Sequence, residues 1–420
     1  MSSINSSLNI AVSALSAQSK AVSTISNNLA NSETVGYKTT DASFASLVTS
    51  SGSAQHFTGA GTQVTPSQNL SEQGLLQSTG STTDLAIDGD GFFVVSDGPD
   101  SGKQLYTRVG DFQPDADGYL VNANGYYLQG YPTDPDGTVN TGITMLEPLN
   151  LDSQTGTAVA TSQLAINGNL PANAEMGASV DTEVEIYDSL GVAHAVGLTY
   201  TKTGVNQWSL AAKDPVLAAD GTTVSGTANG GGTITFNDDG TVASTVPGDL
   251  TIAVTGWSSG ASDSTIAYDA GLAGSASGLS QFSGDDPDQM TIRSVDQDGV
   301  WYGDFYNTTI DADGLVYANY DNGVSQALYQ IPLATFINPD GLEAVSGNAY
   351  GSTALSGAQT LVDPGEAGAG TIQSAALESS TVDTAEEFSK LIVAQQAYAA
   401  ASEIISTAQE MFDNLMRAKS

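Results

Sequence analysis

Five clusters of the form Asp-x-Asp-Gly have the spacing closest to a chemical site in this sequence. They begin at Asp88, Asp115, Asp134, Asp296 and Asp311. Calcium loops of the EF-hand type start in this way, but they also need an acidic residue at the twelfth position, which supplies two oxygen ligands. None of the twelfth positions is acidic here; they are Pro99, Tyr126, Met145, Asn307 and Asn322. The clusters therefore favour hairpin turns, which Asp and Gly form readily, over calcium sites.

No other set of residues is typical of catalysis or metal binding. The two histidines, His56 and His194, are far apart in the sequence and lack metal-ligand spacing, so we expect them at surface loop and strand positions. We find no phosphate-binding loop or dinucleotide fingerprint. Acidic pairs are too common for any two to be singled out as a catalytic dyad. We therefore predict a protein that is not an enzyme and has no catalytic residues, cofactor or metal ion.

Composition limits the remaining classes of function. The 420 residues are too many for one core, and the 46 glycines indicate a turn-rich, β-rich middle. A formal net charge of -37 makes nucleic acid and anionic membranes poor partners. The lack of cysteine excludes disulfides and is compatible with an extracellular location. With no apolar run long enough to span a bilayer and no ordinary secretory signal, we expect export without a cleaved signal peptide and no membrane insertion.

The N-terminal end of the chain has the hydrophobic spacing expected of a long helix. At four-three spacing one seam consists of Ile4, Leu8, Ala11, Leu15, Gln18, Val22, Ile25 and Leu29. A second stripe of smaller residues beside it consists of Ile10, Ala14, Ala17 and Ala21. The remaining face is mostly serine with Lys20 as its only charge, so it lacks the charged i,i+4 pairs that stabilise a lone helix. This helix therefore needs a partner.

The C-terminal end predicts that partner, a second long helix that begins where Asp383 and Glu386 have capping-box spacing. One of its seams contains Phe388, Leu391, Tyr398, Ile405, Phe412 and Met416, and the other Ala394, Ala397, Ala401, Ile404, Ala408, Met411 and Leu415. Two apolar seams on each helix exceed what one pairing covers, which favours packing between many copies over a coiled-coil stalk within one molecule. The predicted polymer interface consists of Ile4, Leu8, Leu15, Val22, Leu29, Phe388, Leu391, Tyr398, Ile405 and Phe412.

A short motif follows the first predicted helix. It runs Asn28-Leu29-Ala30-Asn31, then Thr34-Val35-Gly36-Tyr37-Lys38, followed by Phe44. This pattern resembles the N-terminal motif of the bacterial flagellar rod and hook proteins, an axial protein family in which Phe is more usual at the position of Tyr37. The signature residues are Asn28, Asn31, Gly36, Tyr37 and Lys38. Residues 84–95 and 106–131 are similar to the second and third signatures of the same family.

The middle of the chain is divided by changes in composition and by an internal repeat. Residues 311–316 repeat residues 115–120 almost position for position, which suggests one domain built from both sides of an insert. We therefore expect a multidomain α+β protein, with paired terminal coiled-coil helices at a polymer core and nested β-rich outer domains. The expected parts are a core helix with the signature (1–40), a connector (41–73), the first half of an inner β-domain (74–148), an inserted outer β-domain (149–285), the second half of the inner β-domain (286–352), a Gly/Ala-rich connector (353–380) and a C-terminal core helix (381–420).

The resemblance implies a structural role, and the large insert favours a hook subunit over the shorter rod proteins. Such subunits self-assemble into a flexible, curved, hollow tube that transmits motor torque from rod to filament as a universal joint. By resemblance the partners are many copies of the same chain, the distal rod protein, the hook cap, the hook-filament junction protein and the flagellar export apparatus. Two alternatives stay open: a distal rod or hook-filament junction protein, and an acidic secreted adhesin or calcium-binding β-protein.

Overall fold

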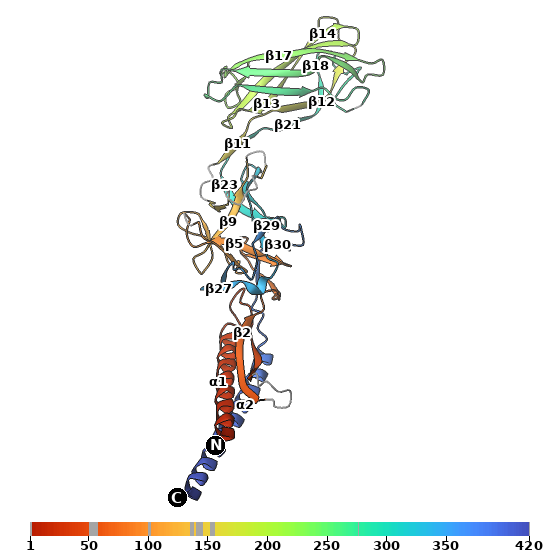
Figure 1. Ribbon diagram of the computed structural model, residues 1–420. Coiled ribbons are helices and arrows are strands. Elements are labelled where there is room, and N and C mark those ends of the chain that lie inside the picture. Colours follow the sequence, from red (N-terminus) through yellow and green to blue (C-terminus); the bar gives the residue numbers. More distant parts are fainter. Residues whose placement is uncertain are drawn as a thin grey trace. The chain divides into compact units, whose positions relative to one another are not determined.

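The computed structural model describes residues 2–49, 58–99, 102–134, 138–139, 146–151, 156–275 and 277–419 (Figure 1). His56 and Met145 fall outside these ranges. The chain forms two compact units. Unit 1 consists of Met1–Ser153, Thr308–Ala318 and Gln326–Ser420, and unit 2 of Gln154–Asn307 and Asn319–Ser325. The protein is mostly β-structure, with one long helix near each end of the chain.

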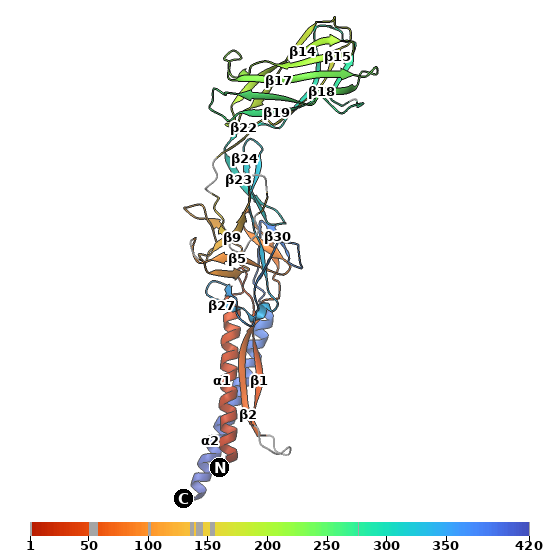
Figure 2. The same ribbon diagram turned by 45° about the horizontal axis from the view of Figure 1, so that its top comes forward.

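The two long helices of unit 1 are α1 (Ser2–Ala30) and α2 (Thr384–Lys419), which lie side by side (Figure 2). The predicted cap of α2 is present, because the Oδ1 atom of Asp383 accepts hydrogen bonds from the backbone N–H groups of Ala385 and Glu386 at 2.8 and 3.1 Å. A β-hairpin of β1 (Thr40–Thr49) and β2 (Thr58–Gln68) packs against α1. The sequence analysis treated this segment only as a connector.

The β-rich part of unit 1 contains short strands from both sides of the insert. Its elements are β3 (Leu76–Ser78), β4 (Leu85–Asp88), β5 (Phe92–Ser96), β6 (Gln104–Thr107), β7 (Gln113–Pro114), β8 (Leu120–Val121), β9 (Tyr127–Pro132), β10 (Glu147–Pro148), β26 (Leu333–Thr335), the 3-10 helix η1 (Pro339–Gly341), β27 (Glu343–Val345), β28 (Ala349–Gly351), β29 (Thr360–Val362), β30 (Thr371–Ser374) and β31 (Ala376–Glu378). Strands β30 and β31 pair with β4 and β3. The second expected connector therefore contains strands that close the domain.

A hairpin region joins the two units along the chain. It comprises β23 (Phe305–Ile310), β24 (Leu315–Tyr320) and β25 (Ser325–Gln330), each of which contains residues of both units. The main sheet path runs β23-β24-β25-β9-β5-β6-β28-β27. Edge-to-face aromatic contacts fill the core beside this sheet, with Phe92 against Phe336 and Tyr350.

Unit 2 is built around a ten-stranded sheet with the path β13-β14-β15-β17-β18-β19-β12-β20. The strands of unit 2 are β11 (Thr157–Val159), β12 (Gln163–Pro171), β13 (Ser179–Tyr187), β14 (Ala193–Gly204), β15 (Gln207–Ala212), β16 (Val216–Leu217), β17 (Thr227–Phe236), β18 (Val242–Thr255), β19 (Ser264–Asp269), β20 (Leu279–Phe282), β21 (Thr291–Gln297) and β22 (Val300–Gly303). Of these, β11 and β22 pair with each other outside the ten-stranded sheet. Alternate residues of β13 are buried, as expected for a strand with one face on a core. Trp208 and Tyr200 are fully buried in that core.

The repeated Asp-x-Asp-Gly clusters form matching turns. The Oδ1 atom of Asp115 accepts hydrogen bonds from the backbone N–H groups two and four residues later, at 3.0 and 2.9 Å. Asp311 does the same at 3.1 and 2.9 Å. Gly118 and Gly314 both have a φ of +83° in these turns. The prediction that the clusters are turns is confirmed at these two sites, since each carboxylate is used to fold its own hairpin.

Candidate assembly surface and its junction

The contact between α1 and α2 is made by small side chains. On α2 the buried residues Ala394, Ala401 and Ala408 recur at seven-residue spacing. On α1, which packs along α2, the buried apolar residues are Ala11, Ala17, Ala21 and Ile25. Small residues let two helix backbones approach closely, but they bury little apolar area. The pairing therefore leaves most of the larger apolar side chains of both helices outside it.

The predicted interface residues lie at the edges of this pairing or outside it. On α2, Phe388, Tyr398 and Phe412 are 51%, 46% and 39% exposed. Leu391 and Ile405 are half-buried, as are the α1 residues Leu8, Leu15, Val22 and Leu29. The side chain of Ile4 lies outside the described part of α1. The exposed α2 seam is available to a further partner, and whether another copy covers it stays a prediction.

Further apolar side chains are exposed on the same helices. Ile392 and Val393 on α2, together with Ile10 and Val12 on α1, are at least 40% exposed. The sequence analysis missed Ile392, Val393 and Val12 because they fall outside both heptad seams. They could have been identified in the sequence as large apolar residues that lie outside both predicted seams. They widen the apolar surface of the helix pair beyond the predicted seam.

The signature residue Asn28 ties the end of α1 to three other segments. Its amide nitrogen donates to the Thr40 carbonyl oxygen at 2.9 Å and to the Glu387 carboxylate at 3.0 Å. Its amide oxygen accepts from the Tyr37 hydroxyl at 3.1 Å and from the Thr40 backbone N–H at 3.1 Å. Burial raises the pKa of Tyr37, which keeps this hydroxyl a donor. One buried amide thus joins α1, β1 and α2.

Lys38 belongs to a buried ion cluster centred on Glu378. The Glu378 carboxylate lies 2.6 Å from Lys38 Nζ and 3.2 Å from Arg108 Nη1, and it accepts the Gly74 backbone N–H at 2.7 Å. All three charged side chains are at most 3% exposed. Burial lowers the pKa of Lys38, and the charge of Glu378 opposes that shift. The cluster joins the signature, the segment after β2, the end of β6 and β31.

Gly36 and Asn31 shape the chain between these two clusters. Gly36 has a φ of +64°, and a Cβ atom there would lie 2.9 Å from the Val109 backbone nitrogen. Its own N–H donates to the Glu378 carbonyl oxygen at 2.8 Å. Asn31 closes the end of α1 by donating its side-chain amide to the Asn27 carbonyl oxygen at 2.8 Å. The five signature residues therefore act as one junction between the helix pair and the β-rich part of unit 1.

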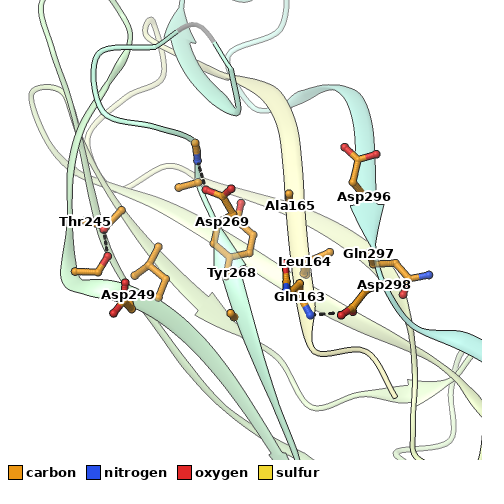
Figure 3. A pocket seen from close by; sticks show the side chains of 15 residues that line it. Gln163, Leu164, Ala165, Thr245, Asp249, Tyr268, Asp269, Asp296, Gln297 and Asp298 are labelled. Atoms are coloured by element: carbon orange, nitrogen blue, oxygen red, sulfur yellow. Dashed lines mark hydrogen bonds between the residues drawn. The ribbon is translucent and has the colours of Figure 1, made fainter. Parts of the chain in front are cut away.

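An acidic hollow of about 490 Å³ in unit 2 is the strongest candidate for the cation-binding alternative (Figure 3). Asp249, Asp269, Asp296 and Asp298 line it. Asp298 accepts hydrogen bonds from the backbone N–H groups of Ser162 and Gln163, and Asp269 accepts the Gly271 N–H at 2.8 Å. These carboxylates are used in local turns and strand ends. Within the described ranges, no three His, Asp or Glu side chains gather as metal ligands would.

Unit 2 contains a Ser-His-Asp arrangement that the sequence analysis did not identify. His194 Nδ1 lies 2.8 Å from Ser225 Oγ, and His194 Nε2 lies 3.1 Å from an Asp188 carboxylate oxygen. All three side chains are at most 1% exposed, so a substrate cannot reach them. The expected surface position of His194 was therefore wrong, although it does lie on a strand. This buried network serves packing, and its members could not be linked by spacing alone.

One Gly-x-Ser-x-Gly match at residues 256–260 was also overlooked in the sequence. It follows β18, as a nucleophile elbow follows a strand, but it leads into a turn and then β19, whereas an elbow leads into a helix. Its middle residue, Ser258, is exposed and is not the serine that faces His194. The match therefore lacks the structural context of a catalytic elbow.

Four family models match the chain in order. "Flagella basal body rod protein" covers residues 8–38, and "Flagellar hook protein FlgE/F/G D1 domain" covers residues 86–171. "Flagellar basal body protein FlaE D2 domain" covers residues 150–300, and "Flagellar basal body rod FlgEFG protein C-terminal" covers residues 373–418. Together they span most of the chain, including most of both long helices and most of unit 2. No described helix combines the length and the apolarity needed to cross a membrane.

Relatives of similar length match nearly the whole chain. The flagellar hook protein FlgE of Rhizobium meliloti is 35% identical, over 99% of this chain and all of the relative. The flagellar hook protein FlgE of Salmonella typhimurium is 31% identical, over 97% of this chain and 98% of the relative. The crystal structure of Helicobacter pylori flagellar hook protein FlgE2 shares the fold, with a TM-score of 0.51 at 16% identity, covering 71% of this chain and 99% of that one.

Proposed function

Because the chain belongs to the flagellar hook protein family, we propose that its copies assemble through α1 and α2 into the flexible, curved, hollow tube that transmits motor torque from rod to filament. The chain is a structural subunit of the bacterial flagellar hook. Neither a rod or junction protein nor an acidic adhesin is favoured, since the full-length relatives are named hook proteins.

One observation carries the proposal. The α1–α2 pairing buries alanines, while Phe388, Tyr398 and other large side chains of α2 stay exposed. Because these side chains are already about half buried, covering the rest of each contributes about half of the ~1.5–3 kcal/mol that full burial of a large apolar side chain gives. A chain with a net charge of -37 repels its own copies, so assembly depends on this apolar surface and is helped by salt. Many copies side by side cover what one molecule leaves bare.

The finer arrangement follows from the same logic. The paired helices pack as coiled coils into a concentric inner wall, and the nested β-rich domains form outer layers that shift relative to one another as the tube bends. The distal rod protein, the hook cap and the hook-filament junction protein contact the tube during or after its growth. Export runs through the flagellar secretion apparatus to an extracellular position, and the terminal helices become fully ordered at the growing end.

The test is assembly of the purified chain at rising ionic strength, followed by electron microscopy. Salt screens the acidic repulsion, so hollow tubes are expected at high salt and monomers at low salt. A protein that stays monomeric at high concentration and high salt, with both terminal helices already ordered, contradicts the proposal.

A further inference from the structure

The far end of α2 is exposed in the part of the chain that the structure describes. Ala408 is the last buried residue described on α2, and every side chain from 409 to 414 is exposed. Both ribbon views show α2 continuing beyond the N-terminus of α1 (Figures 1 and 2). Met411 and Phe412 are 58% and 39% exposed on this overhang. The overhang, residues 409–419, therefore presents a partly exposed aromatic ring on a stretch of helix where every described side chain is exposed.

The opposite end of the helix pair has a hollow that matches such a side chain. A groove of about 430 Å³ opens between α1, β1 and the start of α2. Its apolar lining includes Ile25, Phe44 and Val393, and the last two are 52% and 64% exposed. We call this groove the socket. Its volume lies at the low end of the ~300–1,000 Å³ typical of clefts that hold small-molecule ligands, so it has room for an aromatic side chain together with its neighbours on a helix.

Charge favours the overhang as the occupant of the socket. At the rim, Lys390 Nζ lies within 3.2 Å of the lining carboxylates of Asp41 and Glu386, and it also contacts the buried Glu387. On the overhang, position 419 is a lysine seven residues after Phe412, so it shares that face of the helix. At about 100° per residue, Glu410 falls on the opposite face and Asp413 falls to the side of the Phe412 face. A net negative rim therefore meets an apolar face with a positive end.

The occupant has to come from another molecule. At ~1.5 Å per residue, the stretch of α2 from Val393 to Phe412 spans about 30 Å. Both residues lie on one continuous helix, which prevents the overhang from folding back into its own socket. A contact that uses different surfaces on the two partners repeats without closing whenever its rotation does not close a ring, which is the geometry of a helical tube.

We infer that the α2 overhang of one copy inserts Phe412 into the α1–β1–α2 socket of the next copy, as a head-to-tail contact within the tube. This inference rests on the proposed function, because it names which surfaces of the helix pair meet. It also gives the β1–β2 hairpin a role, since Phe44 on β1 forms one wall of the socket. The hairpin thus helps to build a binding site as well as linking α1 to the β-rich part.

Chemical cross-linking of assembled full-length protein tests the contact. The chain contains no cysteine, so the double variant Ser389→Cys/Met411→Cys has one thiol at the socket and one beside Phe412. Neither change removes the apolar floor of the socket or the aromatic ring. The control is Ile404→Cys/Met411→Cys, whose first thiol is exposed on α2 but does not line the socket. Tubes of each variant are treated with a short bis-maleimide and run on a denaturing gel.

A ladder of dimers, trimers and longer species is expected from the socket variant, because each copy offers both halves of the contact. The control is expected to give a much weaker ladder, because its two thiols lie seven residues, or about 10 Å, apart on one helix face and are joined mainly within one chain. Tubes of the socket variant that give no more ladder than the control overturn the head-to-tail contact and leave the proposed function standing. Wild-type protein that forms no tubes under the same conditions overturns the proposed function, and this inference with it.

Discussion

The helix pair and unit 2 bury their hydrophobic residues in opposite ways. In the helix pair, alanines are inside and residues such as Phe388 and Tyr398 are largely exposed. In unit 2, Trp208 and Tyr200 are fully buried within a continuous core. Unit 2 thus has a core of its own, whereas the helix pair is left with a surface suited to further copies. The difference separates the part that folds from the part that assembles.

A charge placed on the helix pair is expected to have the largest effect. Ile405→Asp, or Leu15→Asp on α1, puts a carboxylate on the proposed interface and is expected to abolish tube formation. The core of unit 2 lies elsewhere in the chain, so its denaturation midpoint should not change. Electron microscopy and denaturant unfolding check the two halves of this prediction.

Ser406→Asp is the matched control, since it adds the same charge at the neighbouring exposed position of α2. Tubes of normal length from Ile405→Asp would contradict the proposal that Ile405 lies at an interface between copies. Loss of the unit 2 unfolding transition in the same variant would contradict the claim that unit 2 folds independently of assembly through the helix pair.

The junction is the next most sensitive feature. Glu378→Ala leaves Lys38 and Arg108 buried without their carboxylate, which is expected to cost unit 1 about 3–5 kcal/mol. Asp181→Ala breaks the exposed pair with Lys213 in unit 2 and is expected to cost about 0–1 kcal/mol. Urea titration followed by probes in each unit measures both. Equal, small effects would mean that the buried cluster does not hold the helices to the β-rich part.

A smaller effect is expected from the backbone of the signature. Gly36→Ala combines a positive φ with a Cβ atom 2.9 Å from the Val109 nitrogen, which is expected to destabilise unit 1 by about 1–3 kcal/mol. Gly125 has a similarly positive φ of +85° but open space around it. Gly125→Ala therefore measures the loss of stability that comes from backbone conformation alone, without a steric clash. If the two variants are equally stable, close approach at Gly36 is not what the motif requires.

The smallest predicted effect is a pH dependence in unit 2. Burial raises the pKa of Asp188, but hydrogen bonds from Ser259, the Val192 N–H and His194 outweigh it and lower the pKa below 3.8. The unfolded state therefore binds this proton at a higher pH than the folded state. The stabilisation is present above pH 3.8 and is lost as the pH falls through the folded-state pKa.

One such proton changes the free energy of unfolding by at most ~1.4 kcal/mol per pH unit. Asp188→Asn is expected to remove that contribution from the acid limb of unit 2 stability, measured by urea unfolding between neutral and acid pH. An unchanged acid limb in the variant would show that the Asp188 carboxylate is not held as the structure places it.

Local features of the sequence predicted the long helices and several turns well. The cap at Asp383 and the turns at Asp115 and Asp311 depend on neighbouring residues, so spacing alone identifies them. Heptad spacing also placed Ala394, Ala401 and Ala408 on one seam of α2, and these three are buried, whereas Ile404 and Met411 of the same predicted seam are exposed. It could not decide which seam meets α1, because that choice depends on how closely the backbones approach, and the alanine seam allows the closer approach.

Individual side-chain contacts between distant segments could not be predicted, although the pairing of the two terminal helices could. Lys38 and Glu378 are 340 positions apart, and nothing near either residue indicates a buried pair. The β1–β2 hairpin has a Ser-, Thr- and Gly-rich composition typical of a connector, and its strands are specified by pairing with each other and by packing on α1. The position of His194 depends on Asp188 and Ser225, which only the folded sheet brings together.

Hydrogen exchange, compared between the soluble monomer and the assembled tube, tests most directly whether the helix pair is completed by other copies. The amides of residues 4–29 and of α2 should exchange fast in the monomer and slowly in the tube, whereas the core strands of unit 2 should exchange slowly in both. Strong protection of both helices in the monomer, unchanged on assembly, would show that the helix pair is already complete alone.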